Sequence, residues 1–357
     1  LVSQLPGGAY FGRWNLSGYS PLGRGQGINI TNNYSIASNF TKILGKHTMK
    51  MGADIRRIHF ITQNTGNVLE FTFNDTWTRR LWNQAEANAG DSFASFLLGL
   101  PGGGGTNRSF FPLFPFYKNW YSAFFFQDDY RVSRKLTLNL GLRYDINMPA
   151  TEKYNRLNRG FDFTSAAPYR NQLPANLLIT PSLQNLVGGL NFAGTGGNPA
   201  NSGNTYNNTW QARLGFAYSF SDKLVMRGGY GRYYMNPSNN NLRSIGFETE
   251  TPMVDSLDAG RNPIPNLLSN PFPTGISNPS GAGLGVSTFV GRDFNHWNPN
   301  FRLPSIDQFS FGFQYQLSNR SVLDISYIGS RTNDHETELS RNIPSPAFMR
   351  QCDALQG

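Results

Sequence analysis

The chain of 357 residues combines few charged side chains (15%) with many aromatic ones (14%) and 38 glycines. This balance favours a β-rich protein with long connections over a helical protein, which would need more Ala, Leu, Glu and Lys. The net charge of +9 comes from scattered Lys and Arg residues that form no basic run, which argues against nucleic acid as a partner.

The first predicted strands form a pair near 28–63. Segments 28–40 and 47–56 alternate apolar with polar residues, the second more strictly than the first. Alternation of this kind is typical of strands with two chemically different faces. The alternation breaks down at 57–61, so we expect the strand to bulge there or to leave a membrane.

A short helix is expected at 91–99, between the first and second strand pairs. Asp91 stands at its start, where a carboxylate can cap free backbone N–H groups. The glycine-rich stretch 101–107 lacks the Lys-Ser/Thr of a phosphate-binding loop. We interpret it as a flexible link.

The second strand pair is expected near 118–148. From Leu136 to Met148 every second residue is apolar, and polar residues fill the gaps. Asp128 falls on the apolar edge of its strand, close to a short turn. Either the boundary of a membrane tolerates the carboxylate there, or a bulge at 127–129 turns it to the other face.

The third and fourth pairs are expected near 209–235 and 305–332. Segments 209–220, 308–317 and 321–330 repeat the alternation, with Phe, Tyr, Leu and Ile on one edge and Gln, Arg, Ser and Gly on the other. The two-faced pattern therefore recurs along nearly the whole chain.

The connections between strands are of two kinds. Short polar turns close each pair, whereas links of 64–117, 149–208 and 236–304 join successive pairs. Links this long are uncommon in compact soluble domains, but outer-membrane barrels combine short periplasmic turns with long outer loops. No apolar run approaches the ~20 residues of a membrane-spanning helix. The sequence therefore predicts an all-β, antiparallel up-and-down transmembrane barrel with about eight strands in this chain.

In such a barrel the apolar edge of each strand faces lipid and the polar edge faces a wet interior. A soluble sheet also alternates, but it turns its apolar face inward. Aromatic residues near the strand ends, among them Trp120, Tyr144 and Trp210, favour the membrane, because amphipathic rings prefer the lipid–water boundary.

Several segments resemble pieces of a known family. Residues 121–145, YSAFFFQDDYRVSRKLTLNLGLRYD, closely resemble the strand–turn–strand signature of TonB-dependent outer-membrane receptors. The best match is the Oar-like group, which carries an N-terminal carboxypeptidase-regulatory-like domain. Segments 47–57, 91–101, 211–234 and 304–331 resemble successive pieces of the same barrel.

The resemblance implies that residues 1–357 are a central section of a barrel of about 22 strands, in the outer membrane of a Gram-negative bacterium. It implies energy-coupled import of a bulky nutrient such as a glycan, a peptide or a metal chelate. The expected partners are outer-membrane lipid, this small or oligomeric ligand, and the TonB complex. The family's plug and TonB-binding segment are not recognisable here, so TonB would act through a missing N-terminal part.

Candidate ligand-binding residues come from the polar strand edges and from the links. Lys50 and the arginines on the polar edges are expected to pair across strands with Asp54, Asp145 and Asp324, or else to form a basic interior that attracts anionic ligands. The resemblance implies that ligands are held by the outer loops and the upper barrel wall, where rings can stack on sugars or peptides. The seven candidates are Arg143, Arg213, Arg227, Trp120, Tyr117, Tyr233 and Trp297.

No catalytic pattern is found. The four histidines lack metal-ligand spacing such as HExxH, and GxSxG is missing. The acidic stretch 334–338 is interpreted as a solvated loop. Cys352 is the only cysteine, so the chain has neither an internal disulfide nor a cysteine-based metal cluster. We expect no enzymatic activity, no metal and no cofactor.

Two other functions stay open at this point. One is a passive porin-like channel or an outer-membrane adhesion or structural scaffold, without energy coupling. The other is a soluble β-rich carbohydrate-binding protein, for which the Asn-, Gly- and aromatic-rich links would be suitable. A plug and a TonB-binding segment before residue 1 would favour the receptor, and a soluble product without detergent would favour the last.

Overall fold

The computed structural model describes residues 12–23, 27–64, 68–84, 88–102, 108–111, 114–168, 170, 186–235, 242–265, 267–340 and 350. The glycine-rich 103–107 and Cys352 lie outside them. The main feature is an antiparallel sheet of eight long strands. They are β2 (Gly27–Leu44), β3 (His47–Asn64), β6 (Phe116–Arg131), β7 (Leu136–Asn147), β11 (Trp210–Ser219), β12 (Leu224–Tyr234), β14 (Ser305–Ser318) and β15 (Ser321–Asn333).

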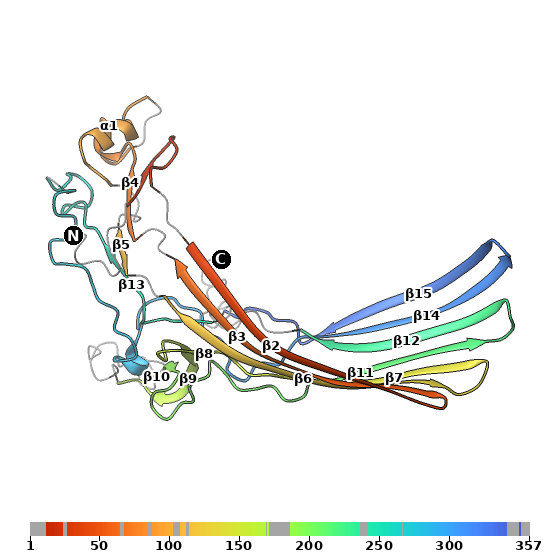
Figure 1. Ribbon diagram of the computed structural model, residues 1–357. Coiled ribbons are helices and arrows are strands. Elements are labelled where there is room, and N and C mark those ends of the chain that lie inside the picture. The colour runs from red at the N-terminus through yellow and green to blue at the C-terminus, as the bar shows by residue number, and fades with distance from the viewer. Residues whose placement is uncertain are drawn as a thin grey trace.

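The strands lie in the order β15–β14–β12–β11–β7–β6–β3–β2, so neighbours along the chain are neighbours in the sheet. Each predicted pair is one hairpin of this sheet. All four hairpin turns lie at one end of the sheet, and the long links lie at the other (Figure 1). The expected all-β, up-and-down architecture is confirmed.

The register keeps side chains of one kind on one side of the sheet. Leu138 pairs with Phe216, Phe216 with Gly228, and Gly228 with Phe311. Paired residues in an antiparallel sheet point to the same side. We call this side the apolar face, and we call the opposite side, which carries Asn139 and its partners, the polar face.

Side chains on the apolar face are exposed rather than packed into a core. Leu140 is 42% exposed, Phe311 44% and Phe313 40%. A soluble sheet would bury such side chains against a second layer. The exposed apolar face is instead the arrangement that a membrane barrel requires, with hydrocarbon as the missing layer.

The two expected irregularities leave the strand pairing undisturbed. β6 pairs with both neighbours without a shift through 127–129, so the alternative of a bulge is wrong. Asp128 lies on the apolar face near the hairpin turns, with its Oδ2 2.6 Å from Nδ1 of His47. The pairing of β3 also continues through 57–61 without a bulge. Its polar residues there lie on the apolar face at the end next to the links.

The links, together with the segment before β2, contain short strands that the sequence did not predict. A second sheet has the order β1 (Arg13–Leu16), β4 (Leu69–Phe73), β5 (Arg108–Phe111) and β13 (Thr249–Pro252). A further pair is formed by β9 (Asn158–Ala166) and β10 (Val187–Phe192), and β8 (Thr151–Glu152) pairs with β6.

The second sheet carries the largest hydrophobic core of the described residues. Phe71 and Phe73 from β4 pack there with Leu16, Met253 and Leu267, which come from three different parts of the chain. We call this second sheet and its core the cap. Full burial of one such side chain contributes about 1.5–3 kcal/mol. The links are thus partly a folded body at one end of the main sheet.

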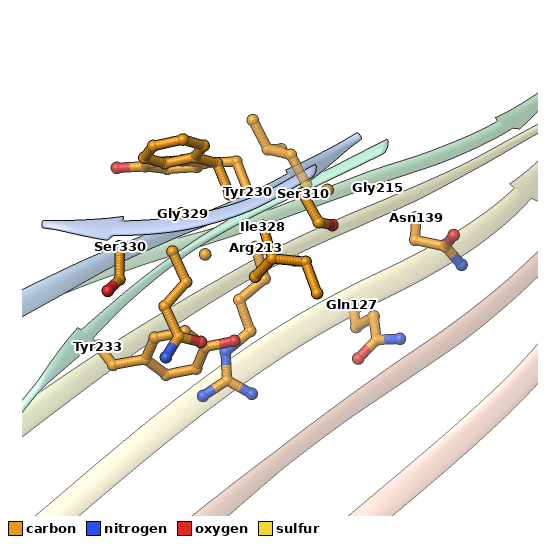
Figure 2. Close-up of a pocket in the computed structure, with 16 residues that line it drawn as sticks. Gln127, Asn139, Arg213, Gly215, Tyr230, Tyr233, Ser310, Ile328, Gly329 and Ser330 are labelled. Carbon is orange, nitrogen blue, oxygen red and sulfur yellow. The ribbon is translucent and has the colours of Figure 1, made fainter. Parts of the chain in front are cut away.

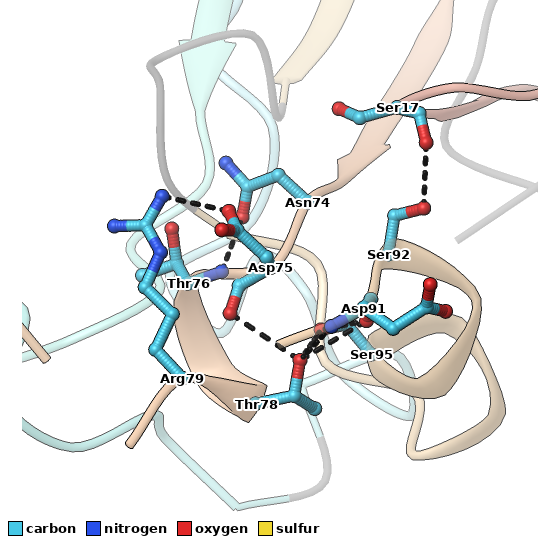
Figure 3. A network of polar contacts seen from close by, with 9 residues as sticks. All are labelled: Ser17, Asn74, Asp75, Thr76, Thr78, Arg79, Asp91, Ser92 and Ser95. Atoms are coloured by element: carbon cyan, nitrogen blue, oxygen red, sulfur yellow. Dashed lines mark hydrogen bonds and ion pairs between the residues drawn. The ribbon is translucent and has the colours of Figure 1, made fainter. Parts of the chain in front are cut away.

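Helices are short and belong to the links. The α-helix α1 (Ser92–Leu97) confirms the expected helix, and the carboxylate of Asp91 accepts hydrogen bonds from the backbone N–H groups of Phe93 and Ala94. The 3-10 helix η2 (Thr76–Thr78) lies beside it, and Thr78 donates a hydrogen bond to the carbonyl of Asp91 (Figure 3). Another 3-10 helix is η5 (Gly285–Ser287). Among the residues that the structure describes, no helix is both long and apolar enough to cross a membrane.

Candidate functional site

The polar face of β3, β6 and β7 carries a network of ion pairs. The guanidinium of Arg143 lies 2.8 Å from the carboxylate of Asp145 and donates to the hydroxyl of Tyr121 at 2.7 Å. The Tyr121 hydroxyl in turn donates to Asp145 at 3.1 Å. Arg56 pairs with Asp54 on the same face, and its guanidinium lies 5.4 Å from the centre of the Tyr121 ring. These cations are already neutralised within the sheet.

The pairs run along strands rather than across them, which corrects the expectation. Asp54 and Asp145 both face Ala123 of β6 in the register, so neither has a basic residue directly opposite on that strand. Each carboxylate therefore pairs with the arginine two residues away on its own strand. A cross-strand pair does form between Lys50 and Asp129, at 3.9 Å.

Farther along the polar face, a hollow of about 640 Å³ opens over β6, β7, β11, β12, β14 and β15 (Figure 2). Glycines at 141, 215, 229 and 231 line it and leave the backbone uncovered. The polar groups that surround it are Gln127, Asn139, Arg213, Tyr233, Gln308, Ser310 and Ser330. The missing side chains create the space, and amides and hydroxyls supply hydrogen-bond donors and acceptors around it.

Arg213 is the charged residue of this hollow. Its guanidinium lies over the ring of Tyr233, with its carbon 5.0 Å from the ring centre. Within the described residues, neither Arg213 nor Arg227 forms an ion pair, although Asp54, Asp129 and Asp145 neutralise the cations on the neighbouring strands. The register puts Arg227 on the same face, opposite Gly312 of β14, but Arg227 does not line the hollow. The hollow thus combines unpaired positive charge, a ring face and amide groups.

The other predicted site residues do not line the hollow. Arg143 belongs to the ion-pair network. Trp120 lies on the apolar face, under the guanidinium of Arg57 at 4.8 Å. Tyr117 is 8% exposed and packs with Leu157 beneath the links, so its ring is not accessible. Trp297 packs against Phe301 in the third link.

Gln127, Asn139, Gln308, Ser310 and Ser330 were not predicted as site residues. Their signal was the phase of the strands, because all five occupy polar positions of the alternation. Among the residues that the structure describes, no three His, Cys, Asp or Glu side chains are grouped in a way that could hold a metal ion. The amides, hydroxyls and guanidinium that line the hollow could form hydrogen bonds with a polar solute.

Comparison with solved structures identifies remote similarities. The alcaligin outer-membrane receptor FauA from Bordetella pertussis is 9% identical, with a TM-score of 0.33, over 91% of this chain and 32% of that chain. The copper transporter OprC is 12% identical, with a TM-score of 0.38, over 87% and 31%. The ferric-catecholate import receptor Fiu from Escherichia coli K12 is 12% identical, with a TM-score of 0.33, over 89% and 33%. The chain thus spans about a third of the length of these proteins.

No curated protein matches the chain. The sequence pattern of one protein family, described as "Outer membrane beta barrel domain", matches residues 3–356. This match covers nearly the entire chain, and it agrees with the exposed apolar face and the separation of turns from links. The chain therefore belongs to the outer membrane beta-barrel domain family.

Proposed function

We propose that this chain is part of the barrel wall of a TonB-dependent receptor of the Oar-like group, and that the complete protein imports a bulky polar nutrient. The similarity of residues 121–145 to the signature of that family supports the group. Import by the complete protein would require a plug and a TonB-binding segment, with the TonB complex as energy source. The ligand would be a glycan, a peptide or a metal chelate.

The observation that carries the proposal is the hollow on the polar face, with unpaired Arg213 beside Tyr233. In a barrel this face borders the aqueous interior, where a passing solute contacts it. A guanidinium prefers carboxylates and phosphates, which it can bind through two parallel hydrogen bonds. The exposed part of the Tyr233 ring offers a flat surface to sugar rings or peptide groups. We therefore expect a ligand that carries at least one anionic group.

The ion pairs reduce the number of arginines that could form the basic interior expected from the sequence. Arg143 is neutralised by Asp145, so it contributes little free charge to the interior. Arg213 and Arg227 are the arginines that remain for a ligand. Their substitution should change selectivity for ligand charge, whereas substitution of Arg143 should change mainly the packing of the wall.

Uptake measurements in cells that produce the complete protein test this proposal. We expect Arg213→Gln and Arg227→Gln to reduce uptake of anionic oligosaccharides or peptides more than uptake of neutral ones. Equal uptake of both classes by parent and variants would contradict it. Loss of uptake in cells without TonB is also expected, and unchanged uptake there would favour a passive channel.

A further inference from the structure

The apolar face changes character where β3 and β6 approach the links. Arg57 pairs in the register with Trp120, and His59 pairs with Lys118. Below them, on the same face, lie exposed apolar side chains such as Ile55 of β3. The break in alternation at 57–61 is therefore a cluster of basic residues on the outward side of the barrel wall.

Aromatic rings hold these cations at the surface. The guanidinium carbon of Arg57 lies 4.8 Å from the centre of the Trp120 ring, which is 44% exposed. Lys118 and Lys153 both approach the ring of Phe116, with their Nζ atoms 5.2 Å and 5.9 Å from its centre. Cation–π contacts of this kind orient the charges and leave their outer hydrogen-bond donors free.

No carboxylate neutralises the cluster in the described part of the chain. The side chain of Arg57 makes a polar contact with a histidine rather than with a carboxylate: its Nε lies 3.4 Å from Nε2 of His59. Arg232 of β12, on the same face, is by contrast neutralised by a carboxylate, because its guanidinium lies 2.7 Å from Asp307. Arg57, Lys118 and Lys153 thus form a site of uncompensated positive charge.

The depth of the cluster follows from strand geometry. Arg57 lies 10 positions beyond His47, which begins β3 at the hairpin turn. At ~3.3 Å per residue and a tilt of ~40°, this distance spans about 25 Å along the membrane normal. The apolar band of an outer-membrane barrel is also about 25 Å tall. Arg57 and Trp120 therefore lie where hydrocarbon ends and headgroups begin.

We propose that Arg57, Lys118 and Lys153 bind the phosphate groups of an anionic lipid in the outer leaflet. Lipid headgroups occupy this depth on the outward side of a barrel, and unpaired cations there attract anionic headgroups. Arg57 can hold a phosphate through two parallel hydrogen bonds, and the lysines act as point charges beside it. The Trp120 ring anchors the same level of the wall at the boundary of the membrane.

The complete protein in phosphatidylcholine nanodiscs tests this site. The probes are lipid A with two phosphates and the same lipid after removal of its phosphates, and native mass spectrometry measures how much of each is retained. Arg57→Gln and Lys118→Gln should each weaken binding of phosphorylated lipid A about five-fold, which corresponds to the ~1 kcal/mol that one basic residue contributes near an anionic membrane. Arg57→Lys and Lys118→Arg should retain most of the binding.

The matched control is Lys42→Gln. Lys42 lies on the same face but near the hairpin turns, where the register pairs it with Met49. Its substitution should leave binding unchanged. The proposal is overturned if Lys42→Gln weakens binding as much as Arg57→Gln does, if removal of the phosphates has no effect, or if the cluster variants change the oligomeric state without changing lipid retention.

Discussion

The guanidinium of Arg213 lies over the ring of Tyr233, 5.0 Å from its centre, on the polar face of adjacent strands. The contact holds a charge that has no carboxylate partner in the described part of the sheet. Gly231 lies beside the Tyr233 ring, where a Cβ would come within 2.7 Å of the Tyr233 hydroxyl. The hollow around this contact is lined by amides and hydroxyls as well.

Two glycines of this hollow provide a matched pair of substitutions. A Cβ at Gly231 would lie 2.7 Å from the hydroxyl of Tyr233 and would displace the ring from Arg213. A Cβ at Gly229 would meet its nearest atom, Oγ of Ser310, at 3.5 Å, an ordinary contact. We expect Gly231→Ala to weaken ligand binding about two- to five-fold, since a cation–π contact contributes ~0.5–1 kcal/mol. A binding titration with the same ligand measures the affinity of both variants. Gly229→Ala should bind the ligand as tightly as the parent. Equal losses of affinity in both variants would contradict a role of the Tyr233 ring in ligand binding.

The orientation of the sheet predicts opposite effects at neighbouring positions of β7. Leu140→Lys would put a charge into the middle of the apolar face and should cost about 2–4 kcal/mol of unfolding free energy. Asn139→Lys, on the polar face, should be nearly neutral, because Asp129 lies within reach of that position. Urea unfolding of the complete barrel in phospholipid vesicles measures both. Similar losses at the two positions would show that the faces are not in different environments.

Glu152 connects the end of the main sheet to the links. Its carboxylate is buried and accepts hydrogen bonds from the Arg156 side chain and from the backbone N–H groups of Phe116, Tyr154 and Arg156. Burial acts to raise the pKa of Glu152, but these hydrogen bonds outweigh it, so the pKa lies below its usual value. The stabilisation is therefore complete above the ordinary glutamate pKa of about 4.3 and is lost as the pH falls through the depressed pKa of the folded state.

Glu152→Gln should lower the local opening free energy by about 3 kcal/mol, because it leaves Arg156 without its partner. Hydrogen exchange at the amides of Phe116 and Tyr154 measures this loss. Glu250→Gln is the control, since Glu250 pairs with Arg108 at the surface, where an ion pair contributes about 1 kcal/mol or less. Unchanged exchange at Phe116 in the Glu152 variant would contradict the proposed anchoring.

Because the cap has a hydrophobic core, we expect its stability to depend on the buried side chains of that core and not on exposed side chains nearby. Phe73, the last residue of β4, is fully buried in the core of the cap, whereas Phe93 of α1 is 45% exposed. Phe73→Ala should destabilise the cap by about 3–5 kcal/mol and should make the links susceptible to limited proteolysis. Phe93→Ala should leave the cleavage rate close to that of the parent. If both variants resist the protease equally, the links are not held together by this core.

The main sheet could be predicted from the sequence because most of its strands alternate apolar with polar residues and pair with their immediate neighbours along the chain. The cap was not predicted, because Leu69–Phe73 alternates over only five residues, and its polar positions are buried or partly buried rather than exposed. Its partners are also distant in sequence, as the pairing of Leu16 with Phe73 shows. Pairings of this kind leave no local signal.

The site was predicted only in part, for a related reason. Arg213, Arg227 and Tyr233 follow from the phase of single strands. The hollow depends on glycines that meet across three strands, and register between strands cannot be read from one strand alone. Trp120 was assigned to a ligand site although it shares the phase of Phe124 and Phe126, so this signal was present in the sequence.

The orientation of the two faces is tested most directly by spin labels in a lipid bilayer. After replacement of Cys352, single cysteines at positions 139, 140, 310 and 311 would carry a nitroxide, and collision rates would be measured with oxygen and with a water-soluble nickel chelate. We predict that labels at 140 and 311 collide mainly with oxygen from the hydrocarbon, and that labels at 139 and 310 collide mainly with the nickel chelate. The reverse pattern, or no alternation between neighbouring positions, would contradict the assignment of the apolar face to lipid.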